Sequence, residues 1–107
     1  MAEHDDPTPH LTVTTKQDAD GVPLICVAGE LDLATAPKLS AAAKDALEQN
    51  PERVVFDLGE LRFMDSSGLR VLLEVASSVP VSVREASAPV RRVIESTGVD
   101  SVLRLEG

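Results

Sequence analysis

The chain has 107 residues, which fits one domain of ordinary size. Acidic residues outnumber basic ones by 18 to 10, so the net charge of −8 has the wrong sign for binding nucleic-acid phosphates or anionic membranes. Aromatic residues make up only 2% of the chain, which argues against the stacking platforms of single-strand binders, and the single cysteine excludes an internal disulfide.

The N-terminal segment predicts a flexible arm, because residues 1–9 contain two prolines and three acidic residues but no apolar periodicity. This acidic start lacks the basic region of a signal peptide. No apolar run approaches the roughly 20 residues of a membrane span. We therefore expect a cytoplasmic protein whose folded domain covers residues 10–107.

Two segments after the arm predict a β-hairpin. Leu11 and Val13 alternate with threonines, which is typical of a strand with one buried face. Residues 24–28 form an apolar run, which suits a strand covered on both faces. The dipeptide Asp20-Gly21 between the two segments favours a turn.

Helices alternate with strands in the rest of the chain. Thr35 is expected to cap a first helix, with Pro37 in its first turn, that ends before Pro51. The elements that follow are a strand over residues 54–56, a connector over 59–65, a helix from near Ser66, a strand over 79–83, a helix capped by Ser87, and a last strand or turn over 102–105. This order predicts an α/β fold with one sheet, parallel after the hairpin.

The motifs of common enzymes are absent from the sequence. There is no glycine-rich phosphate loop and no Cys or His pair with metal-ligand spacing. Residues 64–68 half resemble the nucleophile elbow of hydrolases, but Met64 occupies the first glycine position and no histidine follows Ser66. We therefore expect a protein that is not an enzyme and has no cofactor.

The segment Asp65-Ser66-Ser67-Gly68 is the main candidate site, and its residue types have two explanations. Asp and Ser are favoured helix caps, so the segment could serve only to start a helix. Alternatively, a serine hydroxyl at a helix N-terminus is accessible, and a phosphate on it would change partner binding by adding up to two negative charges. Gly68 is expected to reject large residues, either because the helix packs closely on the sheet or because a partner approaches there.

Asp32 and Thr35 form a second candidate site, directly after a predicted buried strand. They either make a polar turn or lie beside Ser66. The second explanation follows because both loops leave the carboxyl ends of parallel strands, where ligands and partners often bind.

Three stretches of the chain occur in an order that is characteristic of one family. They are residues 27–32 with Thr35-Ala36-Pro37, residues 54–69, and residues 90–100. Together they resemble the STAS domain family, specifically its bacterial anti-sigma factor antagonists. The resemblance covers about residues 11–105, and the second stretch, with its D-S-S-G motif, is the most specific.

The resemblance implies a fold and a mechanism. The fold is a single STAS-type domain, a small mixed β-sheet with helices packed mainly on one side. The unphosphorylated form would bind an anti-sigma factor that is also a serine kinase, so that a sigma factor is released. The kinase would phosphorylate the first serine after the motif aspartate, here Ser66, and a PP2C-type phosphatase would reverse the modification. The residues expected to contact the partner are Asp32, Thr35, Asp65, Ser67 and Gly68.

Two departures and one alternative accompany the resemblance. Many family members carry a further helix after the last strand, whereas this sequence stops at Gly107, and the connector over residues 76–80 is short. The missing helix would expose apolar surface and favour weak self-association. As an alternative function, STAS domains also serve as scaffolds in stressosome-type complexes or as accessory subunits in lipid transport.

Overall fold

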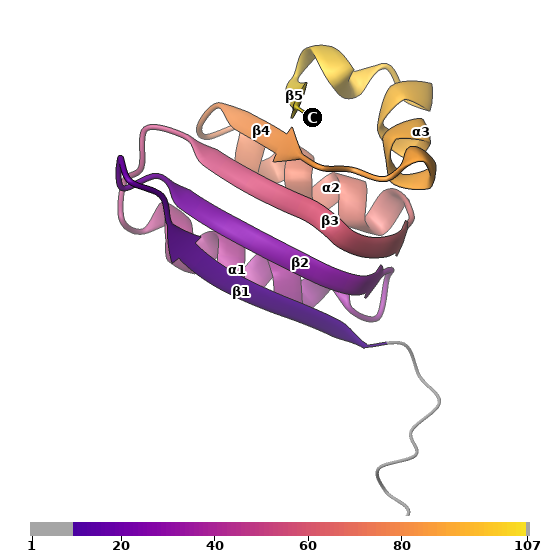
Figure 1. Cartoon of the computed structure of the whole chain (residues 1–107), viewed down its shortest axis with the longest axis horizontal. Coiled ribbons are helices and arrows are strands. Elements are labelled where there is room, and N and C mark those ends of the chain that lie inside the picture. Colours follow the sequence, from indigo (N-terminus) through magenta and orange to yellow (C-terminus); the bar gives the residue numbers. More distant parts are fainter. Residues whose placement is uncertain (1–9, 107) are drawn as a thin grey trace, which may run out of the picture.

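The computed structural model describes residues 10–106 and contains one five-stranded mixed sheet; the predicted arm over residues 1–9 lies outside the described residues. The elements are β1 (Leu11–Gln17), β2 (Pro23–Leu31), α1 (Ala36–Leu47), β3 (Val54–Met64), α2 (Ser66–Ala76), β4 (Val81–Arg84), α3 (Ala88–Ser96), the 3₁₀ turn η2 (Val99–Ser101) and β5 (Leu103–Glu106). The strands lie in sequence order, with β1 antiparallel to β2 and every later pair parallel (Figure 1). The predicted α/β fold and hairpin are confirmed.

Helices α1 and α2 share one side of the sheet because of this strand order. Parallel crossovers are almost always right-handed, so strands added one after another in the same direction place each crossover helix on the same face. Figure 1 shows α1 and α2 together behind the sheet. All three helices contribute to one aliphatic core, in which Phe56 is the single buried aromatic residue. None of the helices within residues 10–106 is long and apolar enough to cross a membrane.

Strand β3 is much longer than predicted, so the expected connector over residues 59–65 is wrong. The strand continues to Met64, and its second half pairs with β2 up to the Leu31–Met64 pair. Two shifts in the β2–β3 register interrupt the ladder, so buried Leu61 and Met64 are separated by two exposed residues. These irregularities remove the period-two pattern on which the sequence-based prediction depends.

The prediction for the fourth strand began two residues too early. Strand β4 starts at Val81, whereas the N–H of Val79 donates to the carbonyl of Val75 at 3.1 Å. Val79 therefore belongs to the turn that directly follows α2. The alternation of valines was not sufficient to predict where the strand begins, because the N–H of Val79 is already used in this hydrogen bond to Val75.

The predicted hairpin turn is confirmed. Gly21 has a φ of +78°, a left-handed conformation that glycine adopts without strain. One carboxylate oxygen of Asp18 accepts hydrogen bonds from the N–H groups of Asp20 at 2.8 Å and Val22 at 3.0 Å. These bonds stabilise the charged carboxylate, so they lower the pKa of Asp18 below its usual value.

Candidate functional site

The carboxyl ends of β2 and β3 bring the two candidate loops together. The N–H of Asp65 donates to the carbonyl of Leu31 at 3.1 Å, which ties the start of α2 to the last residue of β2. Asp32 follows Leu31 directly, so the β2–α1 loop lies beside the N-terminus of α2. The two loops thus lie at the same end of the sheet, as predicted, and a role of Asp32 and Thr35 in partner binding stays a prediction.

Hydrogen bonds hold the β2–α1 loop in one conformation. The Asp32 carboxylate accepts from the N–H groups of Ala34 at 3.0 Å and Thr35 at 3.1 Å. The Thr35 hydroxyl accepts from the N–H of Asp32 and donates to the carbonyl of Glu30, each at 2.9 Å. Thr35 precedes α1 as predicted, but its side chain makes no capping hydrogen bond to the helix, so it orders the loop instead.

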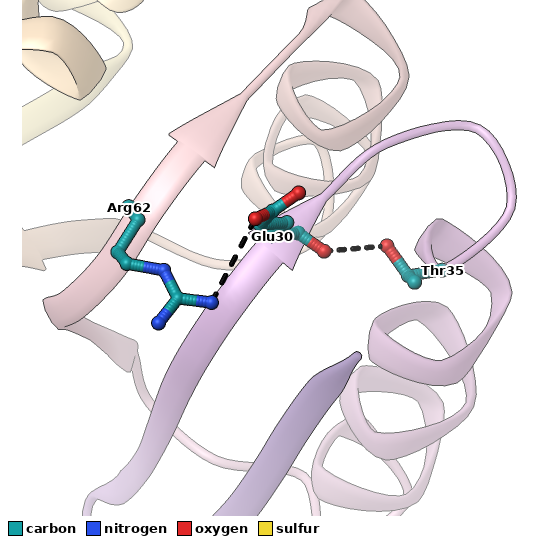
Figure 2. A network of polar contacts seen from close by, with 3 residues as sticks. All are labelled: Glu30, Thr35 and Arg62. Atoms are coloured by element: carbon teal, nitrogen blue, oxygen red, sulfur yellow. Dashed lines mark hydrogen bonds and ion pairs between the residues drawn. The ribbon is translucent and has the colours of Figure 1, made fainter. Parts of the chain in front are cut away.

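Figure 2 shows how this loop is joined to the sheet. The Thr35 hydroxyl points to the carbonyl of Glu30, and the carboxylate of Glu30 faces the guanidinium of Arg62 on β3. The guanidinium nitrogen and the carboxylate oxygen are 3.7 Å apart. Because Arg62 is mostly exposed, this ion pair contributes little to stability, whereas the Thr35 hydrogen bonds are partly buried.

Thr35→Val should lower the free energy of unfolding by about 1–2 kcal/mol. The substitution keeps the shape of the side chain but removes both hydroxyl hydrogen bonds, each of which contributes about 0.5–1.5 kcal/mol. Thr35→Ser retains the hydroxyl and should stay close to the unmodified protein. Urea unfolding of the two variants measures the difference. A larger loss for serine than for valine would show that the Thr35 methyl group, not its hydroxyl, orders the loop.

Asp65 caps α2, and this leaves the Ser66 side chain free. One carboxylate oxygen of Asp65 accepts from the N–H groups of Ser67 at 2.8 Å and Gly68 at 3.4 Å. Ser66 is the first residue of the helix and is exposed, whereas Ser67 is partly buried. Within residues 10–106, no hydrogen bond engages the Ser66 hydroxyl. The capping explanation thus applies to Asp65, and a change at Ser66 removes no hydrogen bond found among the described residues.

Asp65→Ala should lower the free energy of unfolding by about 1 kcal/mol, since it leaves two helix N–H groups without their acceptor. Ser87→Ala is the matched control at the N-cap of α3. The Ser87 side chain makes no capping bond, and its oxygen is buried without a partner among the described residues. Removing it should therefore be neutral or slightly stabilising. Thermal unfolding of both variants tests the pair, and a larger loss at Ser87 would contradict it.

Gly68 lies on the inner side of α2 and is buried. A Cβ at this position would lie 2.5 Å from two carbon atoms of Leu31 and 2.9 Å from Cγ of Met64. Both neighbouring side chains are themselves buried, so neither can move aside freely. The structure therefore favours close packing as the reason for a glycine here, and contact between Gly68 and a partner stays a prediction.

Ser66 opens onto a groove between α1 and α2, which we call the α1–α2 groove. Its volume is about 450 Å³, and its lining includes Leu33, Pro37, Ser40, Ser66, Ser67 and Arg70. Leu33 is 77% exposed although it is a large apolar residue. Leu33 and Arg70 were not among the predicted site residues. The signals in the sequence were an apolar residue in a polar loop and a cation four residues after Ser66. Within residues 10–106, no His, Cys, Asp and Glu side chains are grouped to hold a metal ion.

Comparison with known proteins identifies the family. A family model described as "Mlab, STAS domain" matches residues 14–105. The chain belongs to the STAS domain family. It is 33% identical over 101 residues to the anti-sigma-F factor antagonist RsfB of Mycobacterium tuberculosis, a match that covers 91% of this chain and 83% of RsfB. It is 34% identical over 100 residues to the anti-sigma-B factor antagonist of Listeria monocytogenes, covering 85% of this chain and 83% of that protein.

A solved structure agrees with the sequence matches. The crystal structure of an anti-sigma factor antagonist from Mycobacterium paratuberculosis superposes on this STAS domain with a TM-score of 0.84. The two chains are 31% identical, and the match covers 91% of this chain and 86% of the other. The resemblance inferred from the three sequence stretches is therefore confirmed, as is the fold that it implied.

Proposed function

We propose that this STAS domain is an anti-sigma factor antagonist that works by partner switching. Its unphosphorylated form binds an anti-sigma factor of the serine-kinase type, and a sigma factor is released. Phosphorylation of Ser66 ends this binding, and a PP2C-type phosphatase restores it. Relatives that are 33% and 34% identical over most of the chain are named antagonists of anti-sigma-F and anti-sigma-B factors, which supports the class of function.

The observation that carries the proposal is the exposed Ser66 hydroxyl beside the α1–α2 groove. A kinase must reach the hydroxyl oxygen directly, and Ser66 is exposed while Ser67 is partly buried. The neighbouring Leu33 offers apolar surface that a docked partner would remove from water. The hydrogen bonds of Asp32 and Thr35 hold Leu33 in place before binding, which reduces the entropy lost on docking.

The direct experiment is a pull-down from native lysate with the wild type and Ser66→Ala, followed by addition of ATP and mapping of phosphate. Both forms should capture the same kinase-type anti-sigma factor, but only the wild type should gain phosphate, and on Ser66. Capture of transport-complex subunits without any phosphate would favour the alternative function as an accessory subunit and contradict this proposal. Phosphate on Ser67 would move the site and leave the mechanism in place.

Leu33→Glu should weaken binding to the captured anti-sigma factor by about tenfold or more, since a buried apolar contact at the centre of an interface commonly contributes over 1 kcal/mol. The melting temperature should hardly change, because Leu33 is exposed in the free protein. Val102→Glu is the control: Val102 is another exposed apolar residue, directly before β5. Calorimetric titration compares the variants, and equal effects at both positions would contradict docking at the α1–α2 groove.

A further inference from the structure

We infer that Arg70 is the counter-charge of the phosphate on Ser66, so that phosphorylation creates an ion pair within this chain. The inference rests on the proposed phosphorylation of Ser66 and adds what holds the phosphate. Ser66 is the first residue of α2, and Arg70 follows it by four positions. Residues with this spacing lie on the same face of a helix, with Cβ atoms about 5–6 Å apart. Both side chains are exposed and line the α1–α2 groove.

The start of α2 is poorly suited to hold a phosphate by itself. A helix N-terminus usually stabilises an anion through its free N–H groups. Here the Asp65 carboxylate already accepts from the N–H groups of Ser67 and Gly68. A phosphate on Ser66 would therefore be attached next to a carboxylate that occupies those donors, with Asp32 in the adjacent loop. The charges contributed by these two loops are negative, so the phosphate needs a cation from elsewhere.

Arg70 is the cation that the structure offers. Among the residues that line the α1–α2 groove, Arg70 is the only charged one. The ion pairs of Arg62 with Glu30 and of Arg91 with Glu95 have no counterpart at Arg70: among the side chains described in residues 10–99 and 101–106, no carboxylate lies within 4.0 Å of its guanidinium. An anion four residues before a cation is the favourable order on a helix. The planar guanidinium also matches phosphate oxygens with paired N–H donors.

Phosphorylation would then change the groove in two ways. It adds the negative charge of the phosphate, and it withdraws Arg70 from any acidic group that a partner presents to the unphosphorylated surface. The ion pair also draws the phosphate along α2, over the groove that contains Leu33.

The test uses phosphoserine introduced at position 66 during synthesis of the whole chain, so that no kinase is needed. Titration of the phosphate by phosphorus NMR gives its second pKa. A neighbouring cation stabilises the dianion, so this pKa should be lower by about 0.3 unit or more with Arg70 than in Arg70→Gln. Arg70→Lys should recover most of the shift. Arg92→Gln, which removes an exposed arginine of α3, should leave the pKa unchanged.

Equal phosphate pKa values with Arg70 and with Arg70→Gln would overturn the inference. So would an equal rise in Arg92→Gln, since it would reflect net charge alone. Added salt should shrink the difference between the first two forms, because an exposed ion pair is screened. This result is separate from the proposed function: failure of the lysate experiment to label either Ser66 or Ser67 would end the proposed function without changing the titration.

Discussion

Phosphorylation of Ser66 should weaken binding to the anti-sigma factor by about 100-fold or more while the domain stays folded. The phosphate adds about 1.5–2 negative charges at neutral pH. Within an interface shaped for a neutral hydroxyl, these charges must be desolvated, and the single positive charge of Arg70 does not neutralise the dianion. A buried charge that is not fully compensated costs several kcal/mol. Each 1.4 kcal/mol is a tenfold loss of affinity. The fold is spared because the Ser66 side chain is exposed and makes no hydrogen bond to residues 10–106.

Calorimetric titration of four forms against the captured kinase measures this effect. Ser66→Ala should bind like the wild type, and the phosphorylated protein should bind least. Ser66→Asp should fall between them, since its single charge is smaller than that of phosphate. Melting temperatures of all four forms should agree within a few degrees, which separates loss of binding from loss of folding. Equal affinity of the phosphorylated and unmodified proteins would end the switching mechanism.

Gly68→Val should lower the free energy of unfolding by about 3 kcal/mol, at the upper end of the usual range for overpacked cores. For a domain of this size, such a loss lowers the melting temperature by roughly 10–20 °C. The cause is steric, because a Cβ alone would already lie 2.5 Å from the Leu31 side chain and 2.9 Å from Met64. Any contribution of Gly68 to partner binding should be measured only after this loss of stability is accounted for.

A double-mutant cycle with Leu31→Ala tests the steric cause of the Gly68→Val effect. Leu31→Ala alone should be destabilising, since Leu31 is fully buried. In its presence, Gly68→Val should cost much less, because the valine would enter the space that the leucine left. Urea unfolding of the four proteins gives the interaction energy. Additive losses would contradict a clash with Leu31. A Gly68→Val protein that binds its partner weakly at an unchanged melting temperature would favour direct contact with the partner instead.

The largest error in the sequence-based fold concerns β3. The apolar run over residues 54–56 was enough to predict its first half, because those positions are buried whichever neighbours they have. The second half pairs with β2 across register shifts, and Leu61 and Met64 face the core through an irregular backbone. Alternation of apolar and polar residues predicts regular strands, but not strands interrupted by register shifts. The length of β3 therefore depends on β2, which is more than twenty residues earlier in the chain.

Some features of the candidate site could likewise be predicted from nearby residues, whereas others depend on the fold. Local chemistry was sufficient for Asp65 at the start of α2 and for the exposed serine after it, since a helix cap involves residues two or three positions apart. Thr35 precedes its helix as predicted, but its hydrogen bonds go to Asp32 and Glu30. A threonine before a helix can either cap the helix or order the loop, and the conformation of the loop decided that Thr35 orders it.

The sequence by itself determined the order of the elements and the family, because its D-S-S-G stretch and the two flanking stretches are local patterns. The packing of helices mainly on one side of the sheet was implied by the family resemblance. The tertiary structure alone decided why Gly68 must be small and which residues surround Ser66. Leu31 and Gly68 belong to different elements, as do Leu33 and Arg70. Such contacts depend on how β2, α1 and α2 pack in three dimensions. The spacing of residues along the chain predicts local structure and does not predict that packing.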